Sequence, residues 1–128
     1  MIGRMAVAVV ALVSAAAPAA AASARFGMSY HVERVDAARM DPARCIAAAE
    51  RASNAIGYVT ASRQVHPGQL AVLASGPRGG GGSLTVYCIA VDRKTAFVVQ
   101  ALDYNRPNSP IAQRAADAVR RALLNAAR

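Results

Sequence analysis

The chain has 128 residues, of which 55% are hydrophobic and 5% aromatic, and its 15 basic and 7 acidic residues give a formal net charge of +8. This length suits one globular domain and leaves no room for a second. The charge by itself would fit nucleic acid, but the arginines are spread along the chain and tryptophan is absent, so the clustered, aromatic-backed footprint of a nucleic-acid-binding protein is missing.

Residues 1–24 have the three-part pattern of a secretory signal peptide. A short positive start with Arg4 precedes the apolar run AVAVVALVSAAA and the small-residue tail PAAAASA. The preferred cleavage site follows Ala22-Ser23-Ala24, and Ala20-Ala21-Ala22 is the alternative. We expect cleavage, which makes residues 25–128 a single periplasmic or secreted domain.

An uncleaved membrane anchor is the other interpretation of this segment. An anchor needs about 20 apolar residues. The stretch from Met5 to Ala24 just reaches that length, but it is mostly alanine and contains Pro18. We therefore expect no stable membrane span after cleavage. Removal of Arg4 leaves 14 basic and 7 acidic residues, a net charge of +7.

The mature chain begins with alternating hydrophobicity. The apolar set is Phe26, Met28, Tyr30 and Val32, and the other set is Gly27, Ser29, His31 and Glu33. This alternation predicts a half-buried strand, with the His31 set as its polar outer face.

A helix is predicted between Asp41 and Gly57. Aspartate caps free N–H groups, the following Pro42 is tolerated at the first helical position, and glycine commonly ends a helix. The apolar stripe of this helix consists of Cys45, Ala48, Ala49, Ala52 and Ile56.

Four further strands follow, separated by short turns. They are expected at Tyr58–His66, Gln69–Ser75, Ser83–Val91 and Thr95–Leu102. Consecutive hairpins of this kind imply an antiparallel meander.

A last helix is predicted from about Pro110. One face of it carries Ile111, Ala115, Ala118, Val119 and Ala122. Both helices are amphipathic and need a surface to cover. The order β-α-β-β-β-β-α therefore predicts an α+β fold, a two-layer sandwich of about five mainly antiparallel strands with two helices on one face.

Cys45 and Cys88 are the two cysteines, and an even pair in an oxidising compartment indicates a disulfide. A buried pair of free thiols is the alternative. Zinc needs four ligands and the only histidines are His31 and His66, so we expect no metal site and no cofactor.

A disulfide to Cys88 would turn Leu84, Val86 and Ala90 towards the helices. Thr85, Tyr87, Ile89 and Val91 would then lie on the far face, which is apolar for a surface in water. A homodimer, or a partner that covers this face, is the resulting expectation.

The run GPRGGGGS, residues 76–83, is not a nucleotide-binding loop, because no lysine follows the glycines and the next residues form a strand instead of a helix. The main interpretation is a hairpin connection that uses the conformational freedom of glycine. An anion-binding nest that includes Arg78 remains open.

His31, Glu33 and Ser29 share one face of the first strand, which raises the question of nucleophilic catalysis. Residues two apart on a strand lie about 7 Å from each other and hydrogen-bond poorly. No G-x-S-x-G motif accompanies them. The sequence thus favours a protein that is not an enzyme.

The segment FGMSYHVERV, the Cys45 helix, the stretch HPGQLAVLASGPRGGGGSLTVYCIAVDRKT and the last helix together resemble a small family of exported proteobacterial proteins of unknown function. The resemblance covers nearly all of the mature chain. It implies export and a single domain, and it brings no activity or site residue.

These observations favour a non-enzymatic binding or interaction module of the cell envelope. Arg78, His31, Glu33 and Tyr87 are the candidate contacts to an unknown protein or anionic ligand. Two alternatives stay open: a small periplasmic hydrolase-like enzyme that uses a histidine and a hydroxyl, and association with anionic envelope surfaces through the positive charge.

Overall fold

The computed structural model describes residue 3, residues 8–15 and residues 25–128. The predicted signal peptide lies mostly outside the described residues, and both predicted cleavage sites lie wholly outside them. Within the described part of the chain, no helix has the length and apolar character that a membrane crossing requires.

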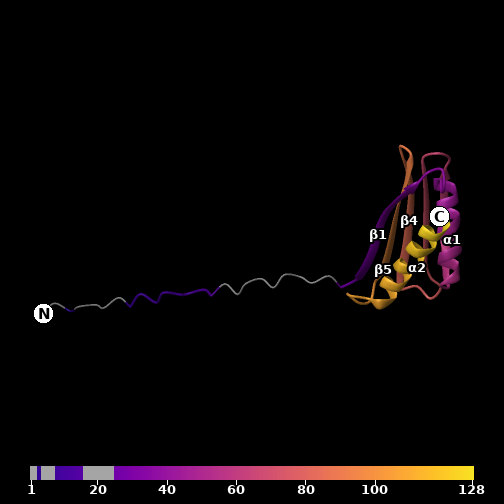
Figure 1. Ribbon diagram of the computed structural model, residues 1–128. Coiled ribbons are helices and arrows are strands. Elements are labelled where there is room, and N and C mark those ends of the chain that lie inside the picture. The colour runs from indigo at the N-terminus through magenta and orange to yellow at the C-terminus, as the bar shows by residue number, and fades with distance from the viewer. Residues whose placement is uncertain (1–2, 4–7, 16–24) are drawn as a thin grey trace.

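The described domain has five strands and two helices in the predicted order. They are β1 (Gly27–Asp36), α1 (Pro42–Ala55), β2 (Tyr58–His66), β3 (Leu70–Pro77), β4 (Gly82–Val91), β5 (Lys94–Asp103) and α2 (Pro110–Ala126). The strands form one antiparallel sheet with the spatial order β1-β5-β4-β3-β2 (Figure 1). The predicted α+β fold class is confirmed.

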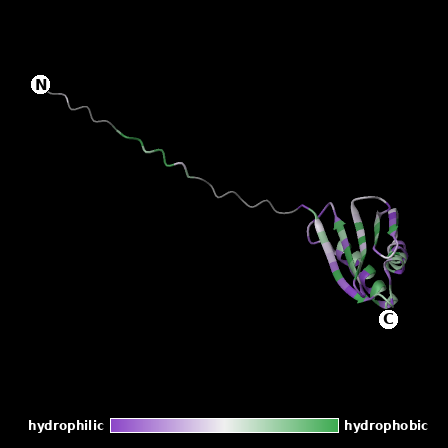
Figure 2. Ribbon diagram, turned by 90° about the horizontal axis from the view of Figure 1, so that it is seen from above, coloured by the Kyte–Doolittle hydropathy of each residue, from purple (hydrophilic) through white to green (hydrophobic). Residues whose placement is uncertain are grey.

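The two helices cover one face of this sheet. α1 packs on β2, β3 and β4, α2 packs mainly on β1 and β5, and the helices contact each other. Figure 2 shows this arrangement from above, with the helices beside the sheet. The opposite face of the sheet carries no element from the described residues.

Both helix starts are capped by side chains. Asp41 Oδ1 accepts a hydrogen bond of 2.8 Å from the Arg44 backbone N–H, as predicted. Ser109 Oγ accepts one of 3.2 Å from the Ala112 N–H. Gly57, with φ of 85°, adopts the left-handed conformation that ends α1.

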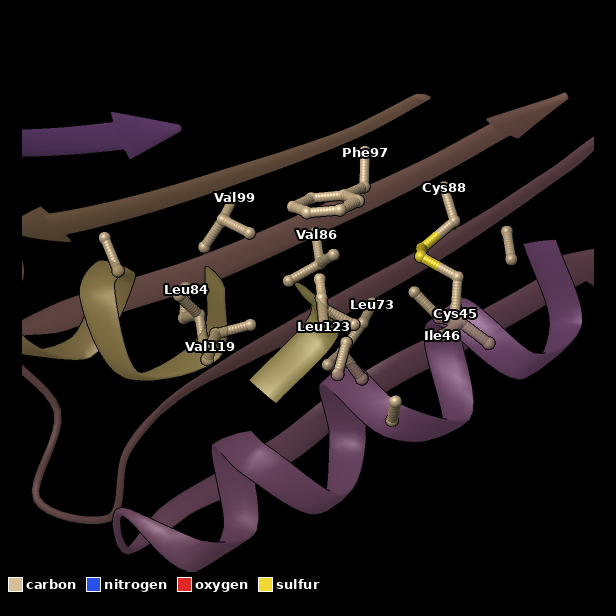
Figure 3. Close-up of a cluster of buried hydrophobic side chains, with 14 of the residues drawn as sticks. Cys45, Ile46, Leu73, Leu84, Val86, Cys88, Phe97, Val99, Val119 and Leu123 are labelled. Carbon is tan, nitrogen blue, oxygen red and sulfur yellow. A yellow bond between two sulfur atoms is a disulfide. The ribbon is translucent and has the colours of Figure 1, made fainter. Parts of the chain in front are cut away.

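The core lies between the sheet and the helices (Figure 3). Its largest fully buried side chains include Phe97, Met40, Ile46, Leu73, Leu84 and Leu123. Alanines on both helices bring the helix backbones close to the sheet, so a few larger side chains fill the space between the layers.

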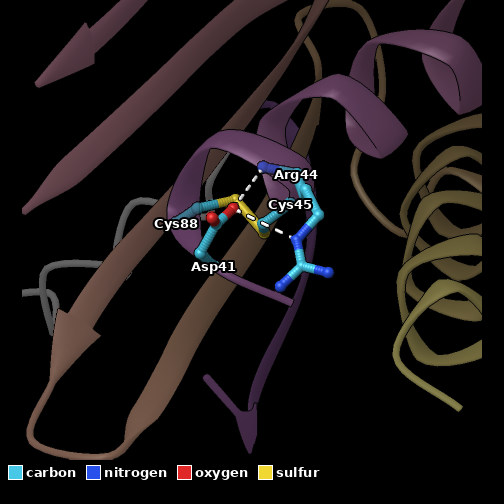
Figure 4. The surroundings of a disulfide bond; sticks show 4 residues. All are labelled: Asp41, Arg44, Cys45 and Cys88. Carbon is cyan, nitrogen blue, oxygen red and sulfur yellow. Dashed lines mark hydrogen bonds and ion pairs between the residues drawn. A yellow bond between two sulfur atoms is a disulfide. The ribbon is translucent and has the colours of Figure 1, made fainter. Parts of the chain in front are cut away.

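Cys45 on α1 and Cys88 on β4 form a disulfide inside this core (Figures 3 and 4). Both residues are fully buried, and their Cα atoms are 6.1 Å apart, within the usual range for a disulfide. The predicted disulfide is confirmed, and the alternative of two free thiols is wrong.

The buried stripe of each helix differs from the predicted one. On α1, Ile46 is fully buried, whereas Ile56 is 36% exposed because it follows the last helical turn. On α2, Leu123 is fully buried and Ile111, in the first turn, is 50% exposed. The structure therefore leaves Ile56 and Ile111, two residues of the predicted helix stripes, outside the core.

Candidate functional site

The polar and apolar faces of β1 are the reverse of the sequence-based interpretation. Met28, Tyr30 and Val32 are exposed, while His31 and Glu33 lie on the side covered by α2. The prediction of a polar outer face for His31 and Glu33 is wrong, because alternation separates two faces without saying which one a helix will cover.

A hydrogen bond and an ion pair hold the polar side of β1 to α2. His31 Nε2 lies 2.6 Å from Asp117 Oδ1, and Arg120 donates to Glu33 Oε1 at 2.7 Å and 2.9 Å. α2 thus presents a polar partner to both His31 and Glu33, so these half-buried side chains are hydrogen-bonded. His31 and Glu33 connect the strand to the helix in this structure.

The His31 pair also bears on the hydrolase alternative. His31 Nε2 contacts the Asp117 carboxylate. Among the described residues, no hydrogen bond joins His31 or His66 to a serine or threonine hydroxyl. Catalysis by a hydroxyl nucleophile requires such a contact with a base. No geometric support for that alternative arises in the described domain.

The uncovered side of the sheet, which we call the open face, has Tyr87 near its centre. The strand register places Val32, Val98, Tyr87 and Val72 in one row across β1, β5, β4 and β3. Leu70, Ile89 and Ala96 occupy the next row. The predicted apolar far face of β4 is therefore part of an apolar surface that extends over four strands.

The glycine run forms the β3–β4 hairpin, as predicted. The Gly80 N–H donates to the Pro77 carbonyl at 2.9 Å, and the Gly81 carbonyl accepts from the Tyr104 N–H at 2.9 Å. Arg78 lies in this turn and lines a surface hollow of about 430 Å³ together with Tyr58 and Thr60. The loop is thus tied to the segment that precedes α2.

The four consecutive glycines of the run, residues 79–82, have different structural roles. Gly81 has φ of 82°, and an added Cβ would lie 2.9 Å from Asn105 Nδ2, whereas a Cβ on Gly79 would meet no atom within 4 Å. We expect Gly81→Ala to lower the free energy of unfolding by about 1–2 kcal/mol. Gly79→Ala is the matched control. It should raise the free energy of unfolding by about 0.4–1 kcal/mol, because alanine reduces the conformational entropy of the unfolded chain. Urea unfolding of both variants checks this, and equal effects would refute the distinction.

A hydrogen-bond cluster fixes the segment between β5 and α2. Ser109 Oγ donates to Asp103 Oδ2 at 2.6 Å, and the Asn105 N–H donates to Asp103 Oδ1 at 2.9 Å. These bonds lower the pKa of Asp103, with the Ser109 bond as the main cause. Burial, and to a lesser extent the charge of Asp103, raises the pKa of Tyr58. Tyr58 therefore remains a protonated donor at neutral pH.

The predicted contact residues occupy three separate places. Tyr87 lies on the open face, His31 and Glu33 lie under α2, and Arg78 lies at the β3–β4 turn. The structure does not bring them into one site. No pattern in the sequence indicated the surface hollow beside Tyr58, because its lining combines residues near the end of α1 with residues of α2.

Comparison with known proteins identifies the family to which the chain belongs. No curated protein matches the chain. Residues 25–128, the whole of the described domain, match the model of a family of unknown function, DUF6180, and the chain belongs to this family.

Proposed function

We propose that the chain is an exported, non-enzymatic interaction module that assembles as a homodimer through its open face. The observation that carries the proposal is the apolar row Val32, Val98, Tyr87 and Val72 on the uncovered side of the sheet. Val32 is 61% exposed and Tyr87 is 38% exposed. An exposed apolar surface of this extent is typical of an interface.

The distribution of charge supports a second copy of the chain as the occupant. The row through Tyr87 carries no ionisable group other than tyrosine. Arg34 and His66 lie at the two ends of the next row, and beyond Arg34 the carboxylate of Asp36 pairs with Lys94. A strongly acidic partner would find no cationic centre here. A copy of the same neutral surface meets no charge repulsion in the middle of the interface.

The size of the open face also suits a dimer. Five strands about 4.8 Å apart and at least eight residues long cover an area of about 600 Å² in projection. The solvent-accessible area of this face is larger than its projected area, because side chains protrude from the sheet. A standard interface buries about 800 Å² per partner, and two such faces can stack as in a sandwich.

The sheet edges are less suited to self-association than the face. β2 has a register shift between Thr60 and Ser62 and carries Arg63, and β1 carries Arg34 and Asp36. Bulges and charges on edge strands discourage edge-to-edge pairing.

Two observations support export. A buried disulfide is typical of proteins in oxidising compartments, and the family match begins at residue 25, where the predicted signal peptide ends. Cleavage itself, and a periplasmic or secreted location, stay predictions. The enzyme and anionic-surface alternatives also stay untested, and no contact among the described residues favours either.

The mass of the mature protein in solution tests the dimer. Light scattering should give twice the mass of one chain, and Tyr87→Lys should give the mass of one chain, because it places an ammonium group in the apolar centre. Gln113→Lys adds the same charge on the exposed side of α2 and should leave the dimer intact.

A wild-type mass equal to one chain at high protein concentration would overturn the proposal, as would dissociation of the Gln113→Lys control. If Tyr87→Lys fails to fold, Val32→Lys at the exposed margin of the same row is the second variant. A folded Val32→Lys protein that remains fully dimeric would also count against this interface.

A further inference from the structure

A second surface lies on the helix side of the molecule, away from the open face. It is a hollow of about 440 Å³ between the end of α1 and the side of α2, which we call the Tyr58 hollow. Its lining includes Ile56, Tyr58, Ile111, Arg114, Ala115 and Arg121. Its volume lies in the lower part of the range of small-molecule sites.

The floor of the Tyr58 hollow is apolar. Ile56 and Ile111 were both predicted to be buried on a helix stripe but lie outside the core, and both line this one hollow together with Ala115 and Ala118. Two exposed isoleucines that face the same space form a surface that an apolar group would cover favourably.

The rim of the hollow is cationic. Arg114 and Arg121 stand seven residues apart on α2, which is about 10 Å along a helix, and neither forms an ion pair with another described residue. The one carboxylate in the lining is Asp117, whose Oδ1 already contacts His31 Nε2. The guanidinium groups are therefore free to bind an anion.

Two further hollows adjoin at Tyr58, and each adds one arginine to the surface around it. One is lined by Arg106, the glycine loop and Asp103, whose carboxylate is bonded to Ser109 and Asn105, and the other is lined by Arg78. The wall of the hollow with Arg106 is held in place by the Ser109–Asp103 bond and by the bond from the Tyr104 N–H to the Gly81 carbonyl. A largely preformed cavity of this kind is typical of ligand sites.

We propose that the Tyr58 hollow binds a small organic anion with an apolar body, such as a carboxylate. The anionic group lies at Arg114 or Arg121, because a guanidinium pairs with a carboxylate through two parallel hydrogen bonds. The apolar body lies on Ile56 and Ile111, and the Tyr58 hydroxyl offers one more donor. This ligand site is independent of the proposed dimer, which uses the opposite side of the sheet.

Titration of the mature protein with octanoate tests the site. Calorimetry should show saturable binding, and amide NMR spectra should show shifts at Tyr58, Ala115 and Ala118 and none at Val98. Octanol, which lacks the charge, and acetate, which lacks the apolar body, should each bind at least about tenfold more weakly.

Charge-removal variants locate the anion. Arg114→Gln combined with Arg121→Gln should weaken octanoate binding by at least about tenfold. The matched control, Arg39→Gln combined with Arg93→Gln, removes two exposed arginines outside both proposed sites and should keep the affinity within about twofold.

Several results would overturn the proposal: no saturable binding of octanoate, equal affinity for octanol, an equal loss in the control variant, or shifts confined to the open face. The Tyr87→Lys variant separates the two proposals. Unchanged octanoate binding by a monomeric Tyr87→Lys protein supports an independent site, and joint loss of dimer and ligand binding contradicts it.

Discussion

Reduction of the Cys45–Cys88 disulfide is expected to lower the free energy of unfolding by about 4 kcal/mol. The bond joins residues 43 apart in the sequence, and a cross-link over a loop of that length restricts the unfolded chain by about this amount in the chain-entropy model. A small domain has only about 5–15 kcal/mol of stability in total. Urea unfolding of the same protein with and without reductant measures the difference.

The Cys45→Ala/Cys88→Ala variant provides the control, because its unfolding should not respond to reductant. Its stability should lie near that of the reduced protein, apart from the small cavity that the missing sulfur atoms leave in the core. Equal stability of the oxidised and reduced wild-type protein would contradict the prediction. Free thiols in the purified, exported protein would contradict the disulfide itself.

Phe97→Ala is expected to lower the free energy of unfolding by about 3–5 kcal/mol. Phe97 is fully buried on β5, where its ring lies between the sheet and the helices beside Val86 (Figure 3). The surrounding strand and helix backbones are tied by hydrogen bonds and by the disulfide, so the cavity left by the ring cannot close fully. Chemical unfolding monitored by circular dichroism gives the magnitude.

Phe97→Leu keeps most of the buried volume and should show a clearly smaller loss than Phe97→Ala. A loss below about 1 kcal/mol for Phe97→Ala would mean that the layers collapse onto the vacated space, against the close packing described above. Comparison of Phe97→Ala with Phe97→Leu thus separates the effect of lost volume from the effect of the lost aromatic ring.

Local signals in the sequence were sufficient for the elements and their order. Asp41 and Gly57 mark the start and end of α1 because capping and left-handed conformations depend on near neighbours along the chain. The strand at Tyr58–His66 has the predicted bounds, and the other strands differ by only a few residues. The disulfide was predictable because the chain has two cysteines and its N-terminal segment predicts export to an oxidising compartment.

The orientation of β1 was not predictable from its own residues. Alternation identified two faces correctly, and the apolar one was expected to be covered. The covering helix, however, presents Asp117 and Arg120 to His31 and Glu33. Which face of an edge strand is buried depends on the helix that packs over it, 86 or 87 residues further along the chain.

The sequence by itself thus determined the secondary structure, the fold class and the disulfide, because these follow from local periodicity, turn chemistry and one pair of residues. The tertiary structure alone decided the extent of the open face and the existence of the Tyr58 hollow. Ile56 and Ile111 belong to the predicted apolar helix stripes and were expected to be buried, yet each lies at a helix end and is exposed. Their meeting with Arg114 and Arg121 depends on how the two helices pack side by side, which no local pattern encodes.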